Sequence, residues 1–245
     1  MQHSQLKVSS TGFDYDRHWM VVDDQGQFLT QRQQSRMVLI KAGIDADRLR
    51  LRAPGMPDLE VDKADGASLL VTVWRDTVRA TTVPMASGWL TEFLGQSCQL
   101  VSLPLSTIRG VDPVFATVKD QVGFADGFPF LLISQASLDD LNSRLQTPLT
   151  MERFRPNLVV SGCEPYQEDS WRRIRIGDIS FRVVKPCSRC TIPTINPETG
   201  RREDIEPLAT LASYRKRDNH VFFGQNLIHD QQGKLSIGME VEIIE

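Results

Sequence analysis

The 245-residue chain has few of the residues from which disulfide and zinc sites are built. It contains four cysteines and four histidines, and aromatic residues make up only 7% of it. The cysteines are unevenly spaced and suggest no disulfide framework, which agrees with a reducing cytoplasm. His220 and His229 lie too far apart for the usual zinc-finger spacing. The sequence therefore gives little support to a disulfide-stabilised fold or to a zinc-finger site.

Long apolar runs and a strong net charge are also lacking. No stretch approaches the roughly 18 apolar residues of a membrane-spanning helix, and residues 1–7 have no apolar core of a signal peptide. The net charge of −3 gives no general attraction to nucleic acid, so we expect neither nucleic-acid scaffold binding nor membrane binding. Basic residues still cluster at 172–175, 201–202 and 215–217. These clusters are either solvated faces, a positive rim around an anionic cofactor, or a docking surface for an acidic redox partner.

The first part of the chain, to about residue 95, is predicted to be rich in β-strands. Short apolar or alternating runs recur with turn residues between them, which is typical of a barrel or sandwich. The predicted strands are 19–23 and 28–30, which form a hairpin, then 37–41, 49–53, 59–61, 69–74 and 78–83. A short helix over 87–94, capped by Ser87 or Gly88, is expected to follow.

The second part continues the β pattern with a few helices. Strands are predicted at 98–103, 130–134, 157–161, 174–179 (a strand pair with a turn), 222–223, 226–228 and 239–244. Ser137 is predicted to be the N-cap of a helix over 138–145, and residues 206–214 also have a helical pattern. Gly233 and Gly238 are expected to be turns. The fold class is therefore mainly β with some helices (α+β).

Cys187-Ser188-Arg189-Cys190 needs a chemical explanation in such a cysteine-poor chain. Zinc is weakly supported, because Cys98 and Cys163 do not form a second pair. A thioredoxin-like pair is also weak, since the β-branched, proline-containing residues 191–195 do not favour a helix. A third interpretation, that both cysteines are inert buried thiols, remains open, although the Arg between them argues against an apolar setting. The remaining interpretation is one thiolate on a soft or high-valent metal held mainly by something else, with Arg189 binding an anion.

Several motifs around this stretch, taken together, resemble the MOSC domain, named after the C-terminal domain of molybdenum cofactor sulfurase. The nearest branch is that of the mitochondrial amidoxime-reducing components and their bacterial relatives. The matching motifs follow the same order along nearly the whole chain: Asp16-Arg17-His18-Trp19, residues 30–33, Phe154-Arg155-Pro156-Asn157, Ser161-Gly162-Cys163, Cys187-Ser188-Arg189-Cys190, residues 196–200, Glu206-Pro207-Leu208, Tyr214-Arg215 and Phe223-Gly224-Gln225-Asn226.

The resemblance implies a fold, a cofactor and a set of site residues. It implies an N-terminal β domain over 1–95 packed on a MOSC-type β-barrel over 96–245, and molybdenum cofactor (molybdopterin) bound with Cys190 as the molybdenum ligand. The cofactor-binding residues would be Arg17, Arg155, Asn157, Ser188, Arg189 and Asn226. A family-level association with pyridoxal phosphate binding also follows from it.

Local chemistry around these positions gives further expectations. Pro156 should favour extended geometry at Arg155, and Arg17 is either paired with Asp16 or in contact with a phosphate. Gly224 would allow a close approach of backbone. Cys163 is expected to be a structural thiol, with a second sulfur near the metal as the alternative. Cys187 is expected beside the metal and not on it, and Cys98 in the core.

Two departures from the family pattern bear on function. Related proteins begin with a strand bearing a Pro-Val-Lys-Ser-like motif whose Lys and Ser help to hold the cofactor, and this strand is expected to be missing here. Many bacterial relatives append a [2Fe-2S] ferredoxin domain, and no Cys₄ cluster follows here. Electrons are therefore expected from a separate flavin or iron-sulfur protein.

Two functional hypotheses follow. The first is a molybdenum-dependent reductase of small N-hydroxylated substrates, such as amidoximes or hydroxylaminopurines, in which the protein tunes and positions the cofactor. The second is a sulfur carrier or cofactor-binding module without reductase activity, in which Cys190 bears a persulfide or holds the cofactor for delivery.

Overall fold

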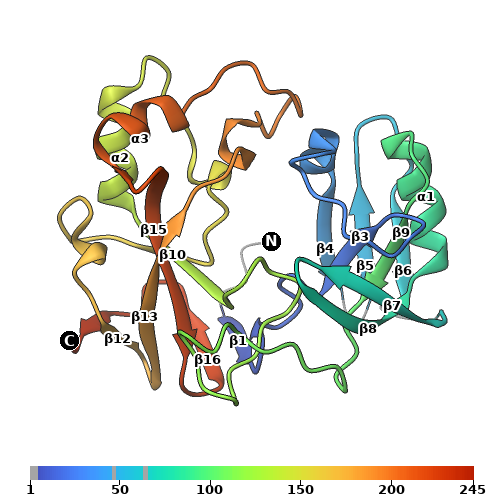
Figure 1. Ribbon diagram of the computed structural model, residues 1–245, viewed down its shortest axis with the longest axis horizontal. Helices are drawn as coiled ribbons and strands as arrows, with labels where there is room; N and C mark the ends of the chain where they lie inside the picture. Colours follow the sequence, from blue (N-terminus) through green and yellow to red (C-terminus); the bar gives the residue numbers. More distant parts are fainter. Residues whose placement is uncertain (1–4, 46–47, 63–65) are drawn as a thin grey trace. The chain divides into compact units, whose positions relative to one another are not determined.

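The computed structural model describes residues 5–45, 48–62 and 66–245, and the chain forms two compact units. Unit 1 contains Met1–Asp14, Gly110–Thr194 and Asp204–Glu245, and unit 2 contains Tyr15–Arg109 and Ile195–Glu203. Both units consist mainly of β-strands, and the described residues form three α-helices in all (Figure 1). The prediction of a mainly β fold with some helices is confirmed.

Unit 1 is built on a seven-stranded sheet with the order β11-β10-β15-β13-β12-β17, in which β14 also pairs with β15. Its strands are β10 (Phe130–Ser134), β11 (Leu158–Val160), β12 (Arg173–Ile176), β13 (Ile179–Ser188), β14 (Lys216–Arg217), β15 (His220–His229) and β17 (Val241–Ile243). The two long strands, β13 and β15, lie side by side in the middle of the sheet. They place the end of β13 against the start of β15, which is where the candidate site lies.

The core of unit 1 is formed by the inward side chains of this sheet. Phe130, Leu132, Phe181 and Leu227 are all less than 2% exposed and belong to one apolar cluster. Phe130 and Phe181 meet edge to face with their ring centroids 5.2 Å apart, an arrangement favoured by the ring quadrupoles. Burial of one such side chain contributes about 1.5–3 kcal/mol, so these strands are fixed in register by their apolar faces.

Two helices cover a second cluster at one end of the sheet. They are α2 (Gln135–Arg144) and α3 (Leu208–Tyr214), which bury Leu138, Leu141 and Leu211 against Phe154 and Phe223. Short 3₁₀ turns complete the unit: η2 (Met151–Arg153), η3 (Gln167–Asp169) and η4 (Ile192–Thr194).

The beginning of the chain also belongs to unit 1. Strand β1 (Gln5–Ser9) pairs with β2 (Gly12–Phe13) on one side and with β16 (Gly233–Ser236) on the other. The buried Nε2 of His229 lies 2.7 Å from the Ser9 carbonyl oxygen. Gly233, predicted as a turn, is therefore the first residue of a strand, because β1 supplies it with a partner from the other end of the sequence.

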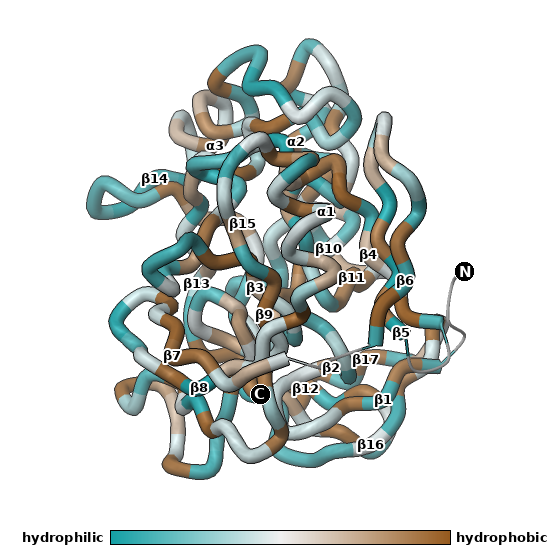
Figure 2. Tube along the Cα trace, turned by 90° about the vertical axis from the view of Figure 1, so that its right-hand side faces the viewer, coloured by the Kyte–Doolittle hydropathy of each residue, from teal (hydrophilic) through white to brown (hydrophobic). Residues whose placement is uncertain are grey.

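Unit 2 holds two antiparallel sheets around one helix. The sheets are β3-β9-β8-β7 and β4-β5-β6, and the strands are β3 (Trp19–Val22), β4 (Lys41–Asp45), β5 (Arg48–Arg52), β6 (Leu59–Asp62), β7 (Ser68–Val73), β8 (Asp76–Thr82) and β9 (Gln99–Ser102). Helix α1 (Pro84–Leu94) buries Trp89, Leu90 and Phe93 against them. Figure 2 shows the resulting alternation of hydrophobic and hydrophilic residues along the strands.

Some predicted elements differ from the observed ones. Residues 37–41 were expected to form a strand, but Ser35–Leu39 is a 3₁₀ turn (η1) and the strand begins at Lys41. Helix α1 starts at Pro84, not at Ser87, because proline fits the first helical turn. The N-cap of α2 is Ser134, whose side chain accepts a hydrogen bond from the Ser137 N–H. The prediction at residues 37–41 was wrong in the type of element, whereas the two helices were predicted correctly and only their starts were misplaced.

Candidate functional site

The Cys187–Cys190 loop lies where the β13–β15 ladder becomes irregular. Pro186 has no N–H to donate, and the register of the two strands shifts between Pro186 and Ser188. Cys187 and Cys190 are half-buried and Ser188 is exposed. Within the described part of the chain, the Cys190 sulfur has no hydrogen-bond partner, so it remains available as a ligand.

Arg189 connects this loop to a second candidate segment. Its backbone N–H donates to the Val221 carbonyl at 2.7 Å. Its guanidinium donates through Nη1 to the Cys187 sulfur at 3.2 Å and through Nη2 to the Phe154 carbonyl at 2.9 Å, and it lies 5.4 Å from the Phe154 ring centroid. Its Nε is buried without a partner. The Arg189 side chain therefore holds the loop against the segment that contains Arg155.

The Arg155-Pro156-Asn157 turn has an unusual backbone. Arg155 is exposed and has a φ of +55°, so the expectation of extended geometry before Pro156 is wrong. The Arg155 N–H donates to the Glu152 carbonyl and closes the turn that follows η2. Such a left-handed conformation costs of order 1–3 kcal/mol in a non-glycine residue and is found most often at functional sites.

Two asparagines tie the neighbouring strands to this turn. Asn157 exchanges two hydrogen bonds with Leu131 of β10, donating from its N–H at 2.8 Å and accepting on Oδ1 at 2.9 Å. Asn226 of β15 lies opposite Leu131 and donates from Nδ2 to the Lys185 carbonyl at 3.2 Å. Both side chains thus make contacts that place the strand ends around the loop.

Gly224 is required by the packing of β15 on β10. Its φ is +81°, and a Cβ there would lie 2.6 Å from Ile133 Cγ1 and 2.8 Å from the Leu132 carbonyl oxygen. The expected close approach of backbone is confirmed, and the approaching groups are those of the neighbouring strand.

Unit 1 therefore brings most of the predicted site residues into one patch, linked through Phe154 and Leu131. These residues are Arg155, Asn157, Ser188, Arg189, Cys190 and Asn226. Arg17 belongs to unit 2, where it has a φ of +47° and its guanidinium forms an ion pair with Asp16. His18 packs against Tyr15 and Trp19.

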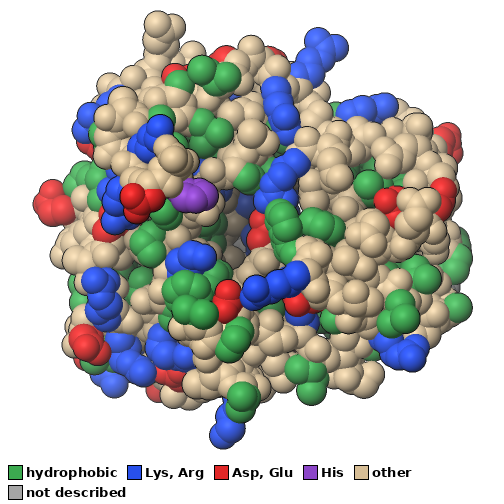
Figure 3. Space-filling view, viewed as in Figure 1, with side chains coloured by type: hydrophobic (Ala, Val, Ile, Leu, Met, Phe, Trp, Pro, Cys, Tyr) green, Lys and Arg blue, Asp and Glu red, His purple; other side chains and the backbone are tan. Residues whose placement is uncertain are grey.

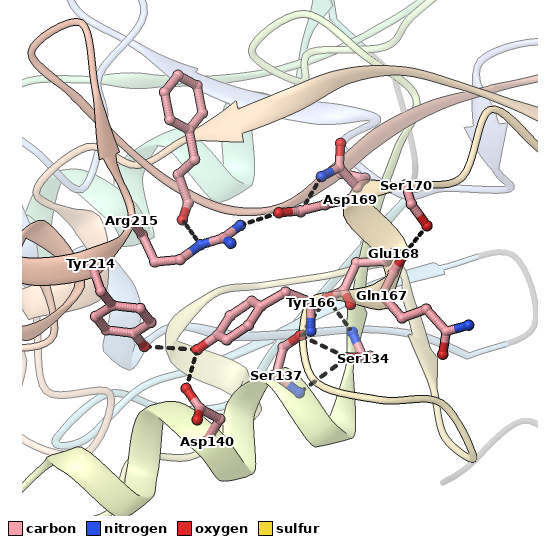
Figure 4. Close-up of polar contacts among 12 residues, drawn as sticks. Ser134, Ser137, Asp140, Tyr166, Gln167, Glu168, Asp169, Ser170, Tyr214 and Arg215 are labelled. Carbon is pink, nitrogen blue, oxygen red and sulfur yellow. Dashed lines mark hydrogen bonds and ion pairs between the residues drawn. The ribbon is translucent and has the colours of Figure 1, made fainter.

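A polar network missed by sequence reasoning supports β15 from the side of the helices (Figure 4). Asp169 accepts hydrogen bonds from Arg215 and from the buried Gln225, both at 2.6 Å. The Tyr166 hydroxyl donates to Asp140 at 2.7 Å and lies 2.7 Å from the Tyr214 hydroxyl. Burial raises the pKa of Tyr166 well above its usual range, so it remains a neutral donor.

The same figure contains a buried carboxylate. Glu168 is 1% exposed and accepts on Oε1 from the Ser134 N–H and the Ser137 hydroxyl, while its Oε2 has no partner. Tyr214-Arg215 and Gln225 lay within recognised motifs, but no local signal pointed to Asp169 or Glu168.

The other two cysteines belong to the apolar clusters of their own units. Cys98 is 3% exposed, and burial raises the pKa of its thiol, which confirms the prediction of a core residue. Cys163 is half-buried against the core of unit 1, and burial raises the pKa of its thiol as well. Among residues 5–45, 48–62 and 66–245, no group of three or more His, Cys, Asp or Glu side chains is placed to hold a metal ion.

Comparison with known proteins gives the family. Residues 119–242 match the MOSC domain, and residues 1–97 match the MOSC N-terminal beta barrel domain. The chain belongs to the MOSC-domain family. It is 36% identical to mouse mitochondrial amidoxime-reducing component 1 over 98% of this chain and 77% of that one, and 37% identical to the human protein over 94% and 73%.

A third relative is molybdenum cofactor sulfurase of Arabidopsis thaliana, which is 33% identical over 95% of this chain and 32% of its own length. The names of these relatives refer to molybdenum cofactor and to amidoxime reduction, and the predicted pyridoxal phosphate association finds no support among them. No helix in the described part of this MOSC protein is long and apolar enough to span a bilayer.

Proposed function

We propose that this MOSC protein is a molybdenum-cofactor oxidoreductase that reduces N-hydroxylated compounds such as amidoximes or hydroxylaminopurines. The observation that supports a metal role for Cys190 is its half-buried sulfur, without a hydrogen-bond partner among the described residues, at the end of an irregular strand. The substrate class follows from the amidoxime-reducing relatives, which match nearly the whole chain.

The residues around Cys190 fit an anionic cofactor that brings sulfur ligands of its own. A thiolate suits a soft or high-valent metal centre. Because the described residues offer no third metal-ligating side chain here, the metal would take its other ligands from the cofactor. Arg153 and Lys185 lie on the adjoining segments, and neither forms an ion pair with a carboxylate in the described part of the chain, so positive charge remains for an anion.

Each part of the patch then has a role. Cys190 would hold the metal, and the exposed Ser188 hydroxyl and Arg155 guanidinium would bind the anionic parts of the cofactor. Asn157 and Asn226 would position the two strand ends, and Arg189 would keep the loop in place. Arg17 of unit 2 stays a predicted cofactor residue. When bound, the cofactor supplies two electrons for cleavage of the N–O bond, with two protons, giving N–H and water.

Metal analysis and a reductase assay test this proposal. We expect one molybdenum per chain in the purified protein and reduction of an aryl amidoxime with reduced viologen as the electron donor. The Cys190→Ala variant should lose activity by more than about 100-fold, the upper effect of removing a residue that only supports a ligand. Cys163→Ala, a thiol of the same unit, is the matched control and should keep its metal.

Two results would contradict the proposal. Cys190→Ala with full metal content and full activity would remove Cys190 from the site. A sulfur adduct on Cys190 in a protein without molybdenum would favour the sulfur-carrier alternative.

A further inference from the structure

The hairpin formed by β14 and the start of β15 is a basic projection next to the candidate site. Lys216 and Arg217 face Val221 and His220 across the hairpin, and residues 216–220 are all exposed. The turn residues Asp218 and Asn219 have φ values of +45° and +64°, as a tight two-residue hairpin turn requires. Figure 2 shows this hairpin as a mostly hydrophilic projection at β14.

The base of the hairpin is firmly held. Arg215, the residue before β14, pairs with Asp169 at 2.6 Å and lies 4.3 Å from the Tyr166 ring centroid. Its backbone carbonyl accepts from the Phe222 N–H at 3.1 Å. These contacts hold the base of the hairpin, so the backbone that carries Lys216 and Arg217 is anchored to unit 1.

Among the described residues, no carboxylate forms an ion pair with the cations of the hairpin. Several other arginines of unit 1 pair with carboxylates: Arg173 with Asp230, Arg175 with Glu242, and Arg182 with both Asp120 and Asp230. Lys216 and Arg217 form no such pair in the described part of the chain, and Arg217 lies 4.8 Å from the ring centroid of Phe222. Asp218 is the one acid of the hairpin, so its net charge is positive. Lys and Arg side chains also appear on the face seen in Figure 3 around the upper part of β15.

The hairpin is directly connected to the Cys187–Cys190 loop. Phe222, under the Arg217 guanidinium, is paired in register with Ser188, and the Val221 carbonyl accepts the Arg189 N–H. Paired residues have Cα atoms about 5 Å apart, and two residues of chain span at most about 7 Å. Phe222 is therefore within roughly 12 Å of Cys190. Electron transfer weakens steeply with distance, so a carrier docked over Phe222 would be well placed.

We propose that the hairpin of residues 216–220 is the docking surface for a small acidic electron-carrier protein that reduces the site. This inference rests on the proposed reductase function. Each carrier delivers one electron and is oxidised, and two deliveries with two protons convert N–OH to N–H and water. Electron-transfer complexes are small and transient, and complementary charge accelerates their formation by 10- to 1,000-fold, so a short basic hairpin is sufficient.

The test compares two electron donors. The protein carrier is an acidic plant-type [2Fe-2S] ferredoxin kept reduced by its flavoprotein reductase, and the chemical donor is reduced viologen. We expect the Lys216→Glu/Arg217→Glu variant to raise the KM for ferredoxin at least about tenfold at low salt. The salt dependence of the ferredoxin reaction should also flatten. The viologen-driven rate and the melting temperature should stay unchanged.

Lys234→Glu is the matched control, because Lys234 is an exposed cation on β16, in a different sheet. Equal ferredoxin KM values for wild type and the double variant would overturn the proposal, as would an equal rise in Lys234→Glu. A wild type that is active with viologen but does not bind ferredoxin at low salt would also overturn it. Absence of viologen activity in the wild type would instead count against the reductase function, and ferredoxin binding to the wild type and the double variant would still decide the surface.

Discussion

Replacement of Arg189 by lysine should loosen two segments at once. The arginine joins the Cys187 sulfur to the Phe154 carbonyl, and a single ammonium cannot make both contacts. Loss of one charge-assisted hydrogen bond costs about 1.5–3 kcal/mol, and part of the cation–π contact, about 0.5–1 kcal/mol, is lost with it. Removal of the buried, unpartnered Nε offsets about 1 kcal/mol. The net loss is about 1–3 kcal/mol.

Hydrogen exchange measures this loss locally. A difference of about 1.4 kcal/mol is tenfold in an opening equilibrium, so amides in residues 154–157 and 187–190 should both exchange about tenfold faster in Arg189→Lys. Arg175→Lys is the control, since its exposed partner Glu242 lies on the edge strand β17. The reasoning is refuted if residues 187–190 exchange faster while residues 154–157 do not, because the side chain would then not connect them.

Two further predictions concern stability. Tyr166→Phe should lower the free energy of unfolding by about 1–2 kcal/mol, because Asp140 loses a donor and the half-buried Tyr214 hydroxyl loses its partner; an unchanged urea midpoint would contradict this. Burial lowers the pKa of His229 below its ordinary value of 6.5, so the unfolded chain binds a proton first as pH falls. Stability should therefore decline from about pH 6.5 down to the folded-state pKa. This pH-dependent loss of stability should be smaller in His229→Gln. If the urea midpoints of wild type and variant change in parallel between pH 5 and 8, another group is responsible.

Local patterns predicted the strands well where apolar and polar residues alternate. Residues 130–134 were predicted with the observed bounds, and β5 was predicted to within one residue. The pattern failed at residues 37–41, where Met37 and Leu39 are apolar because they pack on the core of unit 2 from a 3₁₀ turn. Single residues at element ends depend on which neighbour satisfies a backbone group, and the sequence alone does not show that neighbour.

At the candidate site, too, local motifs were predicted from the sequence but long-range contacts were not. Motif spacing identified the Cys187–Cys190 loop and the Arg155–Asn157 turn, because unusual residues stand close together in the sequence. It did not reveal that Arg189 contacts Phe154, 35 residues earlier, or that Asp169 holds Gln225, 56 residues later. These contacts depend on the pairing of β13 with β15 and on the position of η3 in space. The assignment of Cys190 to molybdenum and the domain boundary near residue 95 stay predictions.

The pairing of β1 with β16 means that unit 1 cannot complete its folding until β16 has been synthesised. Residues 5–9 leave the ribosome long before Gly233–Ser236 are made. At about 5–20 residues per second, the interval is roughly ten to fifty seconds. During translation the β1 edge is unpaired and the side chain of Val8 lacks its final packing partners. Chaperones that hold unfolded chains would bind β1 in this interval. A fragment trimmed to residues 119–242 would retain β16 but lose β1, so shortened versions for expression should keep both ends of the chain.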